Sequence, residues 1–295
     1  MKRRLLPILM TLVLVCALPI WAAFVTSPDV TNPLVSTADA TSPPEPAEVS
    51  TATDLQKKID AGKSVKLMAD ISITSTLKIS SSLTLDLNGY VLKMTGSGSV
   101  LKVSDRATLT ITDSSAAKSG TITGGNAEDG GGVYVEAYAT LEMTGGCITG
   151  CRAVDGGGVY VDYNATLKMT GGCITDCHAS YGGGGIYSYE NLYMGGTAKI
   201  EKCTSKWGSD DAIWNREKCN IYADGGTVDG TVNNQGTIRR SEGAAAETVF
   251  NGTVYNRSAG TIIAGIYNET VENNGTITGG TFWGTVTNKK SAWGE

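Results

Sequence analysis

Three tyrosines that recur at a near-constant interval have the residue type and the spacing to bind a ligand. Tyr134, Tyr160 and Tyr187 each follow a Gly-Gly-Gly-Val or Gly-Gly-Gly-Ile segment, at intervals of 26 and 27 residues. If each occupies the same place in a repeating unit, the three rings stack about 4.8 Å apart on one outer face. Such a stripe stabilises a sheet by cross-strand aromatic packing. It is also a platform for the apolar faces of sugar rings. Packing is the favoured interpretation, and the two are compatible.

Carboxylates recur beside these tyrosines. Glu136 and Asp162 each lie two residues beyond a tyrosine of the stripe and should stack in the same way. A separation of one rung, about 5 Å, is close to the carboxylate spacing of retaining glycosidases, and a stacked pair could also bind Ca²⁺. A solvated acidic surface is favoured, because charged side chains are common on protein surfaces. The two carboxylates therefore join the three tyrosines as candidate ligand-binding residues.

A second carboxylate pair, Asp129 and Asp155, lies beside the triple-glycine segments and is a weak candidate for Ca²⁺. A calcium site needs six or more oxygen ligands, and the Gly-Gly-x-Gly-x-Asp repeat of calcium-binding solenoids is absent. We therefore expect no metal site and no cofactor.

The cysteines fall into columns of their own. Cys147 should stack under Cys173, and Cys151 under Cys177 under Cys203. Neighbouring rungs place Cα atoms within disulfide range, although in-register side chains point the same way. Pairing across the four-residue step and a buried ladder of free thiols are the alternatives. A zinc site is disfavoured by the spacing and by the scarcity of histidine. We expect free thiols or partial disulfides, without redox catalysis.

These columns depend on a repeat that dominates the sequence. The segment 130–135 recurs at 156–161, and the segment 143–149 recurs at 169–175. Within each unit apolar and polar residues alternate, which is typical of strands with one buried face. One unit cannot bury its apolar face alone, but stacked units can. The sequence therefore predicts an all-β fold, a right-handed parallel β-helix solenoid.

Both ends of the repeat differ from its middle. A short helix is expected at 53–62, with Thr53 as N-cap and the Gln56 side chain reaching back to that N-cap residue. This helix would cap the open strand edges. Beyond residue 224 the period shortens to 15 residues. Asparagines then recur, and stacked amides can form a hydrogen-bonded ladder. The ladder residues are Asn256, Asn273 and Asn288.

The N-terminal residues read as an export signal. A basic start is followed by an apolar run and two alanines, which is the pattern of a secretory signal peptide. A Pro/Ser/Thr-rich stretch follows, of a kind that stays extended and solvated. The expected organisation is a signal peptide at 1–23, a linker at 24–50, a capped β-helix with coils of about 26 residues at 51–223, and 15-residue solenoid repeats at 224–295.

The units Gly-Gly-Gly-Val-Tyr-Val and Met-Thr-Gly-Gly-Cys-Ile-Thr, with the segments 65–67, 83–89 and 275–282, carry a family resemblance. Together they resemble bacterial secreted right-handed parallel β-helix surface proteins of the pectin-lyase-like, adhesin-like repeat type. The resemblance covers residues 51–288 and implies the fold and a surface location. This chain differs from such proteins at the column of Cys151, Cys177 and Cys203, where they more often have asparagine.

Composition limits the function classes that remain. The 295 residues hold 24 Lys and Arg against 29 Asp and Glu, with a net charge of -5 and one His. An acidic chain disfavours nucleic-acid binding, and a single His excludes most histidine-based catalysis.

The charges largely follow the repeat, which favours a non-catalytic, secreted or cell-surface, adhesin-like protein that binds a polysaccharide or a host surface glycoprotein. The alternatives are a polysaccharide lyase or glycoside hydrolase of the pectin-lyase-like fold, and a structural spacer of a larger envelope protein. We expect a monomer without stable membrane insertion after signal cleavage.

Overall fold

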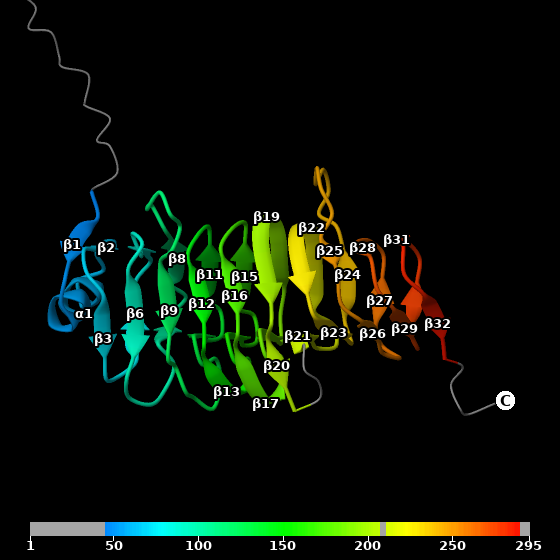
Figure 1. Ribbon diagram of the computed structural model, residues 1–295, viewed down its shortest axis with the longest axis horizontal. Helices are drawn as coiled ribbons and strands as arrows, with labels where there is room; N and C mark the ends of the chain where they lie inside the picture. Colours follow the sequence, from blue (N-terminus) through cyan, green and yellow to red (C-terminus); the bar gives the residue numbers. More distant parts are fainter. Residues whose placement is uncertain (1–44, 207–210, 290–295) are drawn as a thin grey trace, which may run out of the picture. The chain divides into compact units, whose positions relative to one another are not determined.

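Successive turns of the chain stack along one axis to form a parallel β-helix (Figure 1). The computed structural model describes residues 45–206 and 211–289. The expected signal peptide and most of the expected linker lie outside these residues. Within them, every named strand pairs in parallel with its counterpart in an adjacent coil, and the elements alternate between the faces of the solenoid.

A ten-stranded sheet forms one face and runs unbroken along the solenoid. Its strands are β4 (Leu77–Ile79), β7 (Leu101–Val103), β10 (Val133–Val135), β14 (Val159–Val161), β18 (Ile186–Ser188), β21 (Asp211–Asn215), β23 (Thr231–Asn234), β26 (Val254–Asn256), β29 (Val271–Asn273) and β32 (Val286–Asn288).

A 19-stranded sheet supplies the other two faces as two ladders, which are joined because β19 (Leu192–Glu201) and β22 (Asn220–Asp229) pass through both. The first ladder adds β1 (Ala47–Val49), β2 (Val65–Leu67), β5 (Leu83–Asp86), β8 (Thr108–Thr112), β11 (Thr140–Met143), β15 (Thr166–Met169), β24 (Thr237–Arg239), β27 (Thr261–Ile262) and β30 (Thr276–Ile277). The second adds β3 (Ile71–Ile73), β6 (Val91–Met94), β9 (Thr121–Thr123), β12 (Cys147–Thr149), β16 (Cys173–Thr175), β25 (Val249–Phe250), β28 (Ile266–Tyr267) and β31 (Thr281–Phe282). A three-stranded sheet of β13 (Arg152–Asp155), β17 (His178–Gly182) and β20 (Thr204–Ser205) is added in the middle coils.

The core is a continuous column of aliphatic side chains inside the coils. In β11 and β15, Leu141, Met143, Leu167 and Met169 are all fully buried, and the residues between them are not. This alternation follows from the two-residue period of a strand. Stacking identical apolar residues in register is therefore what makes the coils cohere.

The N-terminal end begins earlier than the sequence indicates. Residues 47–49, expected to belong to the linker, form β1 and pair in register with β2. The cap helix α1 spans Ala52–Asp60, and Thr51 rather than Thr53 is its N-cap, because the Thr51 side chain accepts a hydrogen bond from the Asp54 amide. Gly62, with a φ of +64°, follows the helix as expected.

The triple-glycine segments are required by close backbone contacts between coils. A Cβ on Gly157 would lie 2.5 Å from the His178 carbonyl oxygen and 2.6 Å from that of Gly184. The coils can approach this closely only where side chains are missing, so the glycines set the geometry of the turn that precedes the tyrosine stripe.

The coils shorten toward the C-terminus without a break in the fold. Residues that pair in register are 26 residues apart at Cys147–Cys173, 17 at Asn256–Asn273 and 15 at Asn273–Asn288. The expected boundary at 223/224 falls inside β22, which pairs along its length with β19. The short coils therefore continue the same solenoid. Among the described residues, no helix is long and apolar enough to span a membrane.

Candidate functional site

The three candidate tyrosines form one column on the outer face of the ten-stranded sheet. Tyr134 pairs in register with Tyr160, and Tyr160 with Tyr187. The column extends back to Lys102 and forward to Trp214. Each tyrosine lies between two buried residues of its strand, so its side chain is directed away from the core.

Ring orientation decides how much of this stripe a ligand can use. The Tyr160 and Tyr187 rings are stacked, with centroids 5.7 Å apart and planes within 4°. Tyr134 lies edge-on to Tyr160, at 5.4 Å and 70°. Stacked rings cover each other's faces and leave edges and hydroxyls exposed, whereas a sugar ring packs on a free face. Most of the stripe is therefore packing. Tyr134 is its best-placed member for a ligand, although the Lys102 ammonium lies over its ring at 5.0 Å from the centroid.

Tyr187 does not belong to an accessible surface, contrary to expectation. Only 2% of it is exposed, although its register position faces outward. Tyr189 packs against it at 5.4 Å and Trp214 at 6.2 Å, and these rings cover it. The repeat predicts the direction of the Tyr187 side chain but not that other rings cover it. Tyr189 lies in a turn where the equivalent residues of the two preceding coils are the acids Glu136 and Asp162.

Glu136 and Asp162 follow the stripe at equivalent turn positions, and each has its own partner. The Glu136 carboxylate pairs with the Lys102 ammonium at 2.6 Å. The Asp162 carboxylate accepts a hydrogen bond from the Tyr134 hydroxyl at 3.1 Å. Burial and the Asp162 charge raise the pKa of Tyr134 above its ordinary value. The two acids are therefore part of a network that crosses three coils, and not a free carboxylate pair.

The second acidic pair is in register, as expected. Asp129 and Asp155 form a parallel bridge, and Gly182 takes the place of a third acid. Burial raises the pKa of Asp155 to about 6, against the opposing effect of the hydrogen bond from the Gly182 amide. Burial also raises the pKa of Asp129, and the charges of Glu128 and Asp162 add to this. Low solvation, more than mutual repulsion, thus distinguishes this pair from surface acids.

A metal centre is not assembled by these acids. In residues 45–206 and 211–289, no group of three or more His, Cys, Asp or Glu side chains is arranged to hold an ion.

Two grooves flank the Lys102–Tyr134 part of the stripe. A groove of about 500 Å³ lies on one side and is lined by both residues together with Lys78, Asn126 and Asp129. A groove of about 300 Å³ follows the stripe on the other side, and it is lined by Arg106, Glu136, Tyr138 and Asp162, among others. We call the two grooves and the residues between them the stripe site.

Several residues at or near the stripe site are not singled out by the sequence. Tyr138 is 53% exposed with the Arg106 guanidinium over its ring at 4.7 Å, and Tyr163 is 57% exposed. Lys102 lies in a coil without a triple-glycine segment, so no motif marks it. Its signal is register alone, since it precedes Tyr134 in the same column.

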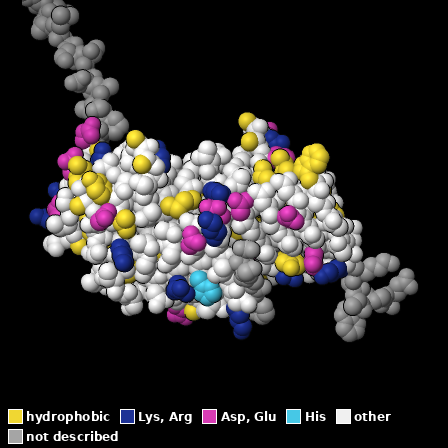
Figure 2. All heavy atoms as spheres, viewed as in Figure 1, with side chains coloured by type: hydrophobic (Ala, Val, Ile, Leu, Met, Phe, Trp, Pro, Cys, Tyr) yellow, Lys and Arg dark blue, Asp and Glu magenta, His cyan; other side chains and the backbone are white. Residues whose placement is uncertain are grey.

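Charged side chains are sparse on the face of the molecule that Figure 2 shows. Uncharged polar side chains and backbone cover most of that face, and charged side chains occur in small groups. No broad basic surface of the kind that binds nucleic acid is visible there.

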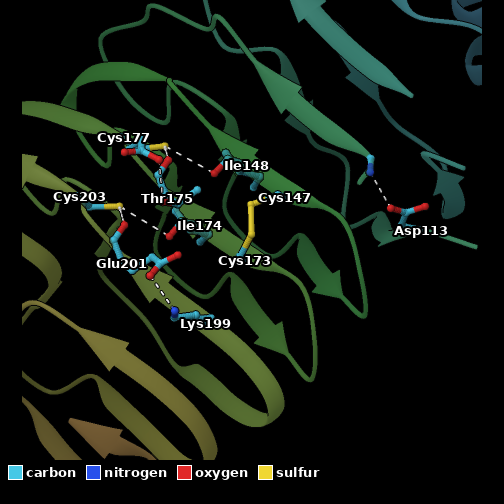
Figure 3. The surroundings of a disulfide bond; sticks show 12 residues. Asp113, Cys147, Ile148, Cys173, Ile174, Thr175, Cys177, Lys199, Glu201 and Cys203 are labelled. Atoms are coloured by element: carbon cyan, nitrogen blue, oxygen red, sulfur yellow. Dashed lines mark hydrogen bonds and ion pairs between the residues drawn. A yellow bond between two sulfur atoms is a disulfide. The ribbon is translucent and has the colours of Figure 1, made fainter. Parts of the chain in front are cut away.

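The cysteines form one disulfide and a column of thiols (Figure 3). Cys147 and Cys173, in register and with Cα atoms 4.5 Å apart, are bridged within their column. Cys151, Cys177 and Cys203 are free and buried. Hydrogen bonding to its two thiol neighbours, together with burial, raises the pKa of Cys177 well above its ordinary value, which makes the Cys177 thiol unreactive. The partial disulfide is one of the states that the sequence left open.

The asparagines form an internal ladder that is longer than expected. Asn256 donates to Asn273 at 2.7 Å, and Asn273 donates to Asn288 at 2.8 Å. The ladder begins earlier, because Asn215 donates to Asn234 and Asn234 to Asn256, each at 2.8 Å. It holds the turns of the short coils in register, and its members are buried except for the last, Asn288.

Comparisons with known proteins identify no relative: no family model, no curated protein and no solved structure matches the chain. The function must therefore be argued from the site alone.

Proposed function

We propose that this protein is a non-catalytic, secreted or cell-surface β-helix protein that binds a glycan at the stripe site. The observation that carries the proposal is Tyr134, which lies edge-on to Tyr160 and between two grooves lined by charged side chains. A sugar ring needs an aromatic surface and convergent polar groups. The stripe site supplies both within three coils.

The network around Tyr134 favours binding over catalysis. Glu136 is paired with Lys102, and Asp162 accepts the Tyr134 hydroxyl. Carboxylates fixed in this way can accept hydrogen bonds from sugar hydroxyls. Their partners hold both carboxylates in fixed positions, which suits hydrogen bonding to a ligand.

A location outside the cell agrees with two features. The basic and apolar start of the chain resembles a secretory leader. The Cys147–Cys173 disulfide is of the kind that persists in oxidising compartments. The acidic composition agrees with a partner other than nucleic acid.

Affinity electrophoresis of the chain without its leader tests the proposal, in gels cast with plant, microbial and host polysaccharides. We expect retardation in at least one gel without loss of polymer, and Tyr134→Ala should weaken it about tenfold, since an aromatic contact contributes about 0.5–1.5 kcal/mol beyond its buried area.

The matched control is Tyr255→Ala. Tyr255 occupies the same outer column in β26, several coils from the grooves, so its loss should leave retardation unchanged. No retardation in any gel, or equal losses in both variants, would contradict the proposal.

A second candidate function is hydrolysis of a glycosidic bond, and it is favoured by one observation. Burial raises the pKa of Asp155 to about 6, and Asp129 lies in register one coil away. Retaining glycosidases use a protonated and an ionised carboxyl about 5–5.5 Å apart. New reducing ends in the gel, abolished by Asp155→Asn, would support hydrolysis and replace the binding proposal.

A further inference from the structure

Beyond the stripe site, we infer that Arg216 and the tyrosines around it form an oxyanion site, which would take the carboxylate or sulfate group of an acidic glycan. The inference rests on the proposed glycan-binding function, and it adds the chemical class of the ligand. Arg216 follows β21 and is half-buried, so part of the residue reaches solvent.

An aromatic cluster holds the guanidinium in place. The Cζ atom of Arg216 lies 5.1 Å from the centre of the Tyr189 ring. Tyr163 packs against Tyr189 at 4.5 Å, and Tyr187 does so at 5.4 Å. Burial lowers the pKa of Arg216, but its interactions with these tyrosines outweigh that effect and raise the pKa. The ring contacts therefore orient the side chain, and a guanidinium is charged at neutral pH.

The charge of Arg216 is not neutralised by a contact within the described part of the chain. The ion pairs there involve Lys102, Lys168, Lys199, Arg240 and Lys289, and none involves Arg216. The Arg216 charge acts to lower the pKa of Asp155, although the two side chains are not in ion-pair contact. A guanidinium that stacks on a ring uses its face and keeps N–H groups at its edge. One donor is engaged by the Tyr187 hydroxyl, and the remaining donors match the paired oxygens of a carboxylate or sulfate.

Arg216 lies on the path of a glycan that extends from the stripe site along the solenoid. The turn residues Asp162, Tyr189 and Arg216 follow one another in successive coils, because their amides donate to Val161 or its equivalents in the preceding coil. Asp162 and Arg216 are thus two rungs apart, which corresponds to about 10 Å. A chain bound at Tyr134 would reach Arg216 within a few sugar units.

Carboxylate and sulfate present the same chemistry to Arg216, so polymers that share one backbone distinguish them. Affinity gels would contain neutral dextran, carboxymethyl dextran or dextran sulfate, and Arg216→Gln would be compared with Arg257→Gln. Arg257 lies two coils further along, over the Tyr255 ring at 4.8 Å, and its guanidinium donates to Asn233. It is therefore a matched cation on an aromatic ring whose guanidinium is already engaged.

We expect the chain to be retarded more by one charged polymer than by neutral dextran. Arg216→Gln should lose about tenfold or more of that affinity, as expected for charge-assisted hydrogen bonds. Arg216→Lys should retain part of it, and Arg257→Gln should retain nearly all. Thermal melts of the variants would show that each is folded.

Equal retardation by charged and neutral polymers, or equal losses in the two glutamine variants, would overturn the oxyanion site. The proposed function would survive that result if Tyr134→Ala still weakened binding to a neutral polysaccharide. If neither charged nor neutral polymers retarded the chain, both proposals would fail.

Discussion

The Tyr134 hydroxyl donates a hydrogen bond to the Asp162 carboxylate of the following coil at 3.1 Å. With the ion pair between Lys102 and Glu136, this contact links three successive coils on the outside of the solenoid. Lys102 and Tyr134 line one groove of the stripe site, and Glu136 and Asp162 line the other. The binding surface is therefore preorganised by the contacts that hold adjacent coils in register, which lowers the entropic cost of binding.

The burial of Asp155 predicts that the stability of the folded protein depends on pH. Its pKa is raised by burial from 3.8 to about 6, so the folded state binds the proton more tightly than the unfolded state does. The stabilisation from this group is complete below pH 3.8 and is lost as the pH rises through about 6. Above that range the buried charge destabilises the fold.

We therefore expect Asp155→Asn to raise the melting temperature at pH 7 by about 2–4 °C, allowing for partial solvent screening. The amide retains an acceptor for the Gly182 N–H, and the gain should vanish at pH 4. Thermal melts of the wild type and the variant across this range provide the measurement. Asp105→Asn, at an exposed turn, is the control. A gain at pH 4 as large as that at pH 7 would contradict the assignment.

The Cys147–Cys173 disulfide predicts a redox-dependent stability. It closes a loop with a sequence separation of 26 residues. Cross-linking a loop of this size is worth about 3 kcal/mol through the entropy of the unfolded chain. Reduction should lower the free energy of unfolding by about that amount, as measured by urea titration with and without reductant.

A double variant, Cys147→Ser with Cys173→Ser, separates this bond from the buried thiols. It should match the reduced wild type and show no further response to reductant. Peptide mapping after thiol alkylation in denaturant should find these two cysteines linked and Cys151, Cys177, Cys203 and Cys219 alkylated. A response of the double variant to reductant would place the bond elsewhere.

The fold could be predicted from the sequence because the same residue types recur at the same position of successive coils. The interval between Tyr134 and Tyr160 predicts their pairing, and the structure has it. The same reasoning places Cys147 on Cys173. A repeat carries this information redundantly, since each apolar residue reinforces the register of the others. This is why a parallel β-helix could be recognised without any relative.

The accessible site could be predicted only in part, because accessibility depends on residues that break the repeat. Tyr187 repeats the position of Tyr160, yet Tyr189 and Trp214 cover it. Glu136 repeats the position of Asp162, yet one pairs with Lys102 and the other with Tyr134. Partners of this kind come from neighbouring coils and turns, and no motif marks them.

The asparagine ladder predicts a gradient in stability along the C-terminal coils. Asn256 is fully buried, and its amide donates to Asn273 while its oxygen accepts from Asn234. Removing it leaves buried donors and acceptors unpaired, each at about 1–3 kcal/mol. We expect Asn256→Ala to lower the free energy of unfolding by about 3 kcal/mol.

Asn288→Ala is the matched control at the open end of the ladder. Its side chain is exposed and accepts one hydrogen bond, from Asn273. Water can replace that contact, so the loss should be below about 1 kcal/mol. Urea titrations of both variants followed by circular dichroism give the comparison. Similar losses in the two variants would mean that the inner amides do not depend on one another, and the ladder would then be a consequence of the repeat and not a cause of its register.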